Sequence, residues 1–331
     1  MGYLLPSPSA ASLPGWLVHP RAGVDYPRNW HELLEWFGDE GACLRYLERL
    51  RWGECSTCRF CGVVDGGWWQ MADGSRRCAA CRSETSVTAG TIFAGTRTPL
   101  VSWFAAVWYV VNPKQGVSAL GLQRVLGLGS YQTAWAWLHK LRRAMVLPGR
   151  ELLTDAVEVD ESYVGARRPG AAGRGVTGKP IVAIAVEDRG EASGRVRMRR
   201  IPDVTKATLT EFVLDHVARA AEVHTDGWQG YFDVGRHRFK HVVTNVSASG
   251  DPAHVVLPHV HRLASLVQRW ILGTHQGAIS HAQLDFYLDE FTFRFNRRQS
   301  RHRGLLFYRL REGALAADPH PYKTLTSESA G

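Results

Sequence analysis

The chain has little cysteine, and all of it lies near one end. Its 331 residues include six cysteines, and none follows Cys81. A disulfide scaffold for the whole chain would need cysteines throughout, so that class is excluded and metal binding in a reducing compartment is favoured. We therefore expect a cytoplasmic protein.

Long apolar runs and acidic excess are also missing. No stretch of about 18 uncharged apolar residues occurs, so no membrane span is predicted. The first 20 residues lack the basic start and apolar run of a signal peptide. Lys and Arg number 40 against 31 Asp and Glu, a formal net charge of +9, alongside 12 Trp, 10 Tyr and 12 Phe. This balance suits a polyanionic partner such as nucleic acid, although a basic soluble protein without such a partner has it too.

Two Cys-x-x-Cys pairs form the strongest local motif. Sixteen residues separate them, and four thiolates at this spacing can converge tetrahedrally on a structural Zn²⁺. Gly62 relieves the turn after the first pair, which favours that pair over an overlapping one that begins at Cys55. Residues 68–70 and 75–77 predict the strands of a zinc ribbon. The predicted ligands are Cys58, Cys61, Cys78 and Cys81.

Helical spacing of apolar residues predicts two short helices within 30–51 and a buried, almost wholly apolar helix over 100–111. Residues 118–126 and 131–145 then predict two helices around a glycine-containing turn. This is the layout of a helix-turn-helix, although a plain helical hairpin has the same pattern. The basic residues expected to contact DNA from this half are Arg76, Arg77, Lys140, Arg142 and Arg143.

A carboxylate at the centre of an alternating strand marks the second half. The strand covers 156–163 and carries Asp160, and a carboxylate on a core strand is costly unless it is paired or holds a metal. A second short strand, 222–226, ends in Asp226. Two strands that each deliver a carboxylate predict a divalent-metal site for phosphoryl transfer, because hard cations take oxygen ligands.

Further elements surround these two strands. Patterning predicts strands over 180–186, 195–201 and 239–244, and helices over 205–220, 260–270 and 284–298. Arg167 and Arg168 lie in a glycine-rich loop after the first strand, and Arg297 and Arg298 end the last helix. We expect these four arginines to contact DNA, although a solvated loop without a role explains the first two equally well.

Taken together, these motifs resemble the bacterial insertion-sequence transposases of the fifteen-ninety-five family, whose catalytic part is the ISXO-like DDE domain. The resemblance runs from about Tyr26 to Leu310. It is carried by the ribbon cysteines and by residues 86–100, 131–142, 159–161, 225–228 and 287–298. It implies a ribonuclease-H-like fold, a nucleoid-associated location, two Mg²⁺ or Mn²⁺ ions, and at least a homodimer that joins two DNA ends.

The chain departs from the family at the third metal position. Most members have Glu or Asn there and a Lys two turns later, where this chain has His261 and Gln268. A His at that position resembles a minority subgroup, so the resemblance implies Asp160, Asp226 and His261 as the catalytic, metal-binding residues. Imidazole suits Mn²⁺ better than Mg²⁺. His259 is a rival third ligand, and either histidine could instead cap the helix.

The sequence thus predicts an α+β or α/β multidomain protein with an N-terminal zinc ribbon and helix-turn-helix, then a ribonuclease-H-like mixed sheet flanked by helices. Its predicted function is DNA transposition: binding of terminal inverted repeats and metal-dependent strand cleavage and transfer. A decayed transposase or a DNA-binding regulator that does not cut is the alternative. A zinc hydrolase is disfavoured, because four cysteines close the metal to water. The predicted boundaries are 1–27 lead-in, 28–52 helices, 53–97 ribbon, 98–150 helical region, 151–312 catalytic domain and 313–331 tail.

Overall fold

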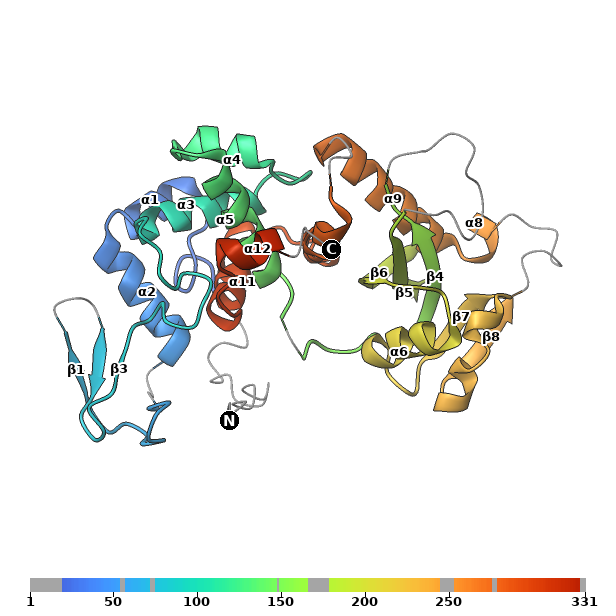
Figure 1. Cartoon of the computed structure of the whole chain (residues 1–331), viewed down its shortest axis with the longest axis horizontal. Coiled ribbons are helices and arrows are strands. Elements are labelled where there is room, and N and C mark those ends of the chain that lie inside the picture. The colour runs from blue at the N-terminus through green and yellow to red at the C-terminus, as the bar shows by residue number, and fades with distance from the viewer. Residues whose placement is uncertain are drawn as a thin grey trace. The chain divides into compact units, whose positions relative to one another are not determined.

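The computed structural model describes residues 20–53, 57–71, 75–147, 149–165, 179–244, 253–275 and 279–327. The chain divides into two compact units (Figure 1). The first unit comprises Met1–Gly149 and Ser300–Tyr322, and the second comprises Arg150–Gln299 and Lys323–Gly331. Each unit is described by itself.

The first unit is built mainly of helices around an aromatic core. The apolar helix α3 has eight buried residues, as its sequence predicts, and α4 and α5 form the expected helix, turn and helix. Gly127 ends α4 with a φ of +62°, a left-handed conformation that glycine adopts without strain. Ser130 then caps α5, because its hydroxyl accepts the Thr133 N–H. The helices are α1 (Trp30–Trp36), α2 (Glu40–Trp52), α3 (Leu100–Val111), α4 (Ala119–Leu126), α5 (Tyr131–Ala144) and α11 (Arg303–Ala316).

A small antiparallel sheet forms the ribbon of the first unit. Strand β1 (Trp68–Gln70) pairs with β2 (Arg76–Cys78), which pairs with β3 (Glu84–Thr85). The first two strands lie where the sequence predicts them. Their pairing places Trp68 opposite Cys78, so the second cysteine pair begins at the end of a strand.

Helix α11 belongs to the first unit, whereas the sequence predicts a catalytic domain that extends to residue 312 and so includes the first part of this helix. The reason lies in Arg311, which is fully buried and has its guanidinium carbon 3.1 Å from the centre of the Phe104 ring. Tyr46 and Phe307 also face this cation, at 5.8 and 5.5 Å. Cation–π contacts compensate a buried charge in part. These contacts hold α11 against α2 and α3.

The second unit is a five-stranded mixed sheet in the order β6-β5-β4-β7-β8. Strands β4, β5 and β6 form the predicted antiparallel meander. Strand β7 pairs parallel with β4, and β8 pairs parallel with β7. This is the ribonuclease-H-like arrangement that the sequence predicts. The strands are β4 (Ala156–Tyr163), β5 (Ile181–Arg189), β6 (Ala192–Ile201), β7 (Glu222–Asp226) and β8 (Lys240–Thr244).

Helices cover both faces of this sheet, as Figure 1 shows for α6 and α9. On one face Val157 and Val159 of β4 pack with Phe212 of α6. On the other face Val182 and Ile184 of β5 pack with α9 and α10. The second unit's helices are α6 (Lys206–His216), α8 (Ala253–Val256), α9 (Pro258–His275) and α10 (Leu284–Asn296), with short 3₁₀ turns η2 (Gln229–Tyr231), η3 (Val234–His237) and η4 (His281–Gln283). The last helix, α12, covers Tyr322–Ser327.

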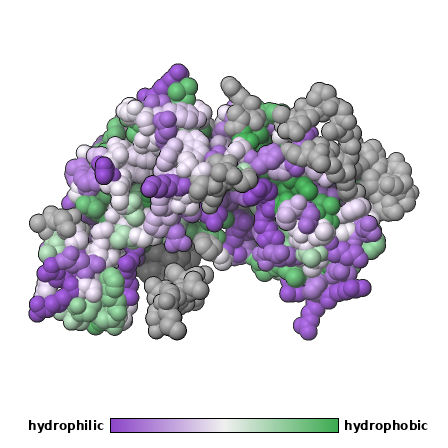
Figure 2. Space-filling view, viewed as in Figure 1, coloured by the Kyte–Doolittle hydropathy of each residue, from purple (hydrophilic) through white to green (hydrophobic). Residues whose placement is uncertain are grey.

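Both units expose hydrophilic residues over much of the face drawn in Figure 2. Within the described part of the chain, no helix has the length and apolar character that crossing a membrane requires.

A glycine at the contact of α11 with α5 offers a test of the packing. A Cβ at Gly313 would lie 1.9 Å from the Ala144 carbonyl oxygen, far inside van der Waals contact. We predict that Gly313→Ala lowers the free energy of unfolding by about 1–3 kcal/mol, the usual cost of overpacking. Gly273→Ala in α9 is the control, because nothing lies within 4 Å of its added Cβ, and it should be neutral or stabilising. Chemical denaturation measures both, and an unchanged Gly313→Ala would contradict this packing.

Candidate active site and zinc centre

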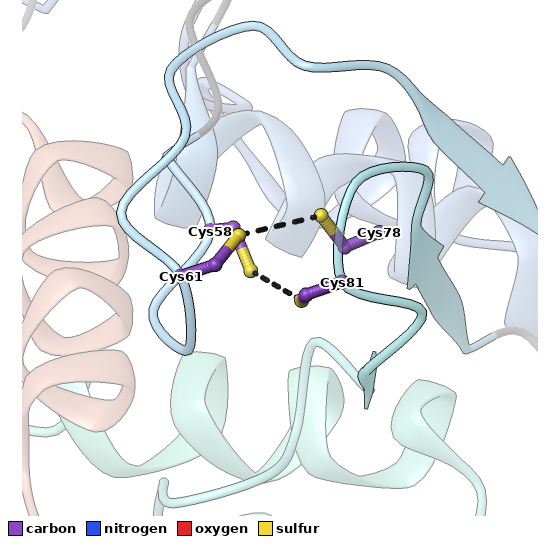
Figure 3. A group of neighbouring side chains, drawn as sticks. All are labelled: Cys58, Cys61, Cys78 and Cys81. Atoms are coloured by element: carbon purple, nitrogen blue, oxygen red, sulfur yellow. Dashed lines mark hydrogen bonds between the residues drawn. The ribbon is translucent and has the colours of Figure 1, made fainter.

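The four predicted zinc ligands converge, two from each of two turns (Figure 3). Cys58 Sγ lies 3.7 Å from Cys81 Sγ, and Cys61 Sγ lies 3.9 Å from Cys78 Sγ. Four sulfurs at about 2.3 Å from a tetrahedral Zn²⁺ stand about 3.8 Å apart. The cluster therefore has the dimensions of a structural zinc site.

Backbone turns hold the two cysteine pairs in similar shapes. The Gly62 N–H donates to the Cys58 carbonyl at 2.8 Å, and the Arg82 N–H donates to the Cys78 carbonyl at 2.9 Å. Gly62 has a φ of +71°, a left-handed conformation that glycine adopts without strain. This agrees with the preference for Cys58 and Cys61 as a ligand pair, which rested on the turn at Gly62. Hydrogen bonds from Ser83 lower the pKa of Cys81 to about 6, which favours the thiolate that binds metal. Cys55 lies outside the described residues.

We predict one Zn²⁺ per chain, lost on Cys78→Ser, because a hydroxyl is a poor substitute for a buried thiolate ligand. Cys43→Ala is the matched control. Cys43 is a fully buried core thiol whose pKa burial raises to about 12, so it should not bind metal. Elemental analysis of the purified chain gives the metal content. A full equivalent of zinc in Cys78→Ser would show that this cysteine is not a ligand.

The two aspartates that the sequence predicts to be catalytic lie on the same face of the second unit's sheet. Glu158 of β4 is level with His224 of β7 in the parallel ladder. Asp160 and Asp226 each follow two residues later, so strand alternation brings both side chains to that face, level with each other. The Asp226 carboxylate accepts the Trp228 N–H at 2.9 Å, which fixes its orientation.

His261 of helix α9 lies beside the first of these two aspartates. Its Nε2 lies 3.7 Å from Oδ2 of Asp160, and both side chains are only partly exposed. They line a cavity of about 200 Å³ together with Ser162 and Tyr163. A carboxylate and an imidazole beside such a cavity form a donor set that suits a divalent cation.

His259, the rival for the third position, points elsewhere. Its Nδ1 lies 3.0 Å from the Ser193 hydroxyl, and its Nε2 lies 3.1 Å from Oδ1 of Asp188. With Glu158 these residues form a second group whose ligand atoms lie within 4.8 Å of one another. The group draws one residue each from β4, the end of β5 and the start of α9, and it shares no residue with the pair formed by Asp160 and His261.

Glu158 joins strand β4 to helix α9. It is 4% exposed, and its Oε2 accepts the Val260 N–H at 2.8 Å. Burial raises the pKa of Glu158, and the hydrogen bond from Val260 opposes this shift. Because Asp160 lies two residues along the same strand and His261 follows Val260, this contact sets the distance between the two candidate ligands.

Gln268, at the position where the resemblance leads us to expect a lysine, hydrogen-bonds to the backbone of Gly165. Its amide donates to the Gly165 carbonyl at 2.7 Å and accepts the Gly165 N–H at 3.3 Å. A lysine cannot make both bonds, because an ammonium group has no acceptor. Gln268 therefore ties α9 to the chain just beyond β4.

Two further residues lie close to the candidate site, on the α6 side of the sheet, and were given no role from the sequence. Tyr231 is fully buried, and its hydroxyl donates to Oε2 of Glu161 at 2.9 Å. Burial raises the pKa of Tyr231 well above its usual value, and the charges of Glu161, Asp160 and Asp226 add to the effect. The Tyr231 phenol is thus neutral and donates a hydrogen bond to the Glu161 carboxylate. The only signal in the sequence is an aromatic residue shortly after Asp226.

The two ribbon arginines expected to meet DNA are held by acids of their own unit. Arg76 lies 3.3 Å from Glu48, and its guanidinium packs 4.4 Å from the Trp52 ring. Arg77 Nε donates to Glu84 at 2.9 Å.

Helix α5 presents its basic residues unequally. Arg143 is exposed, whereas Lys140 is half-buried with its ammonium 3.5 Å from the Ile92 carbonyl. Burial lowers the pKa of Lys140. The structure corrects the expectation for Arg142, which is 2% exposed. It shares the inward face of the helix with Leu138 and so cannot reach phosphate from the folded unit.

The two arginines that follow α10 stack on their own helix. The guanidinium carbon of Arg297 lies 4.2 Å from the Phe293 ring, and that of Arg298 lies 4.0 Å from the Phe295 ring. Arg298 remains exposed. Arg167 and Arg168 lie outside the described residues.

Comparison with known proteins finds two matching domain families. Residues 152–296 match the family described as the ISXO2-like transposase domain, and residues 38–84 match the transposase zinc-ribbon domain. No curated protein matches the chain. Among solved structures, the catalytic core domain of BIV integrase is similar over 41% of this chain and 81% of that chain, with 15% identity and a TM-score of 0.29.

The fold, the cysteine cluster and the two matched domains define a transposase with a zinc ribbon and a DDE catalytic domain. Both domains are those of the insertion-sequence transposases of the fifteen-ninety-five family, and together they cover more than half of the chain. The chain belongs to that family.

The hydrogen bond between Glu158 and α9 gives a further prediction. Glu158→Ala leaves the buried Val260 N–H without its acceptor, so we expect the free energy of unfolding to fall by about 1–3 kcal/mol. Glu158→Gln keeps an acceptor oxygen and should lose less. Urea denaturation of the two variants measures the difference. Equal losses would mean that the hydrogen bond does not anchor the helix.

Proposed function

We propose that this transposase cuts and joins DNA strands at a divalent-metal site formed by Asp160, Asp226 and His261. The observation that carries the proposal is the placement of the three residues. Two carboxylates share one face of neighbouring parallel strands, and the imidazole lies 3.7 Å from one of them beside a cavity. Oxygen ligands on two strands suit cations that hold phosphate oxygens.

Each residue has a separate task in this proposal. Asp160 and Asp226 supply carboxylate oxygens, and the Trp228 N–H keeps the second carboxylate aligned. His261 supplies a nitrogen from the first turns of α9, which favours Mn²⁺ over Mg²⁺ relative to a carboxylate. Two bound ions would activate the attacking water or 3′ hydroxyl and stabilise charge on the scissile phosphate during in-line displacement.

The first unit would recognise the DNA. A zinc ribbon and a helix-turn-helix with an exposed Arg143 are suited to contact the terminal inverted repeats and the target. In the second unit Arg298 is exposed at the end of α10, and Arg167 and Arg168 complete the proposed phosphate contacts. Because two element ends must be joined, the active assembly would contain at least two chains.

Nicking of a DNA that carries the flanking repeats tests the site. We predict that Asp160→Ala and Asp226→Ala each reduce cleavage to background while repeat binding stays nearly unchanged. His261→Ala should lower the rate by more than about tenfold, the lower end of what loss of even an outer-shell metal partner causes. His261→Glu should shift the preference from Mn²⁺ towards Mg²⁺, because a carboxylate suits the harder ion.

Asp215→Ala is the control, because Asp215 pairs with Arg199 at the surface and takes no part in the proposed site. Wild-type cleavage by His261→Ala with both metals would remove His261 from the site. Repeat binding without cleavage by the wild-type chain under any metal would instead identify a DNA-binding protein that has lost catalysis.

A further inference from the structure

A groove between α1 and α2 of the first unit lies outside the sites described above. Its volume is about 420 Å³, and it is largely open to solvent. We name it the α1–α2 groove and define it by Trp36, Phe37, Arg45, Tyr46 and Arg49. Neither the zinc cluster nor the candidate active site includes any of these residues.

The floor of the groove is aromatic and rigid. Phe37 and Tyr46 are buried and pack edge to face with ring centroids 4.9 Å apart. The Tyr46 hydroxyl donates to the Asp25 carbonyl at 2.7 Å, which fixes its ring. Trp36 packs edge to face on Phe37 with ring centroids 6.1 Å apart and remains partly exposed. An indole surface is therefore available to a flat ligand.

Two arginines line the groove four residues apart on α2. Both are exposed, and Arg49 also lies 5.2 Å from the Tyr46 ring. Among the described residues, no acid lies within ion-pair distance of Arg45 or Arg49. The ribbon arginines Arg76 and Arg77 differ in this respect, because both have carboxylate partners. The two groove arginines can therefore bind an external anion without breaking an internal pair.

We propose that the α1–α2 groove binds an unpaired nucleotide of DNA, with its base on Trp36 and its phosphates at Arg45 and Arg49. The inference rests on the proposed DNA-processing function and adds a binding site to it. Aromatic faces beside a basic groove are the usual means of holding single-stranded nucleic acid. A base within a duplex is already stacked, so only an unpaired base can lie flat on the recessed indole.

The net charge of +9 and the exposed guanidiniums favour a polyanion over an apolar peptide. An acidic peptide with an aromatic side chain is the competing occupant. The two differ in their dependence on salt, because a nucleic acid carries condensed counterions that are released on binding.

The test is equilibrium binding of the full chain, without divalent metal, to fluorescein-labelled oligothymidylate and to a blunt duplex of similar length. Trp36→Ala should weaken oligothymidylate binding about tenfold, within the range that one stacked base contributes. Trp36→Phe should keep part of the affinity for oligothymidylate that Trp36→Ala loses. The double variant Arg45→Gln/Arg49→Gln should reduce the slope of log affinity against log salt by about 1.4, because single strands release about 0.7 counterion per phosphate contact.

Trp30→Ala and Arg309→Gln are matched controls. Trp30 is an exposed tryptophan of α1 outside the groove, and Arg309 pairs with Glu312. Neither should change oligothymidylate binding, and no variant should change binding of the blunt duplex by more than about twofold. Groove variants that bind oligothymidylate like the wild type would overturn the inference, as would equal losses on both DNAs. Nicking by the wild-type chain would then still stand as support for the proposed function.

Discussion

The register between the parallel strands β4 and β7 is the constraint on which the candidate active site depends. It places Glu158 level with His224, and therefore Asp160 level with Asp226, on one face of the sheet. A shift by one residue would turn one aspartate towards the core formed with α6. Val157 and Val159 oppose such a shift, because both are fully buried on that other face. The apolar residues of β4 thus fix where its carboxylates point.

Helix α9 completes the site because the same strand anchors it at two points. Glu158 accepts the Val260 N–H near the start of the helix, and Gln268 binds both backbone groups of Gly165 just beyond the strand. His261 lies between these anchors. Gln268, which we expect at the position of the family's lysine, therefore has a structural task of its own. The arrangement explains how a chain can lack that ammonium group and still hold α9 beside the carboxylates.

Much of the fold could be predicted from local sequence, because each signal has a local cause. Alternating valines predicted strand β4, paired cysteines predicted the ribbon, and the apolar sequence of α3 predicted its burial. The predictions that failed depend on contacts between residues that are far apart in the chain. Arg311 places α11 in the first unit through aromatic rings from other helices, and Arg142 points inward because of how α5 packs. Nor can spacing alone show that His259 faces Asp188 while His261 faces Asp160.

Iron-directed cleavage of the polypeptide tests directly where the divalent metal binds. Fe²⁺ that replaces the native ion, with ascorbate and peroxide, generates hydroxyl radicals that cut the backbone beside the metal. Mass spectrometry of the fragments then locates the ion. The account predicts cuts near Asp160, near Asp226 and in the first turns of α9, all suppressed by excess Mg²⁺ or Mn²⁺. Cuts at the β5–β6 turn near Asp188, with none near Asp226, would place the ion in the group of Glu158, Asp188 and His259 and contradict the account.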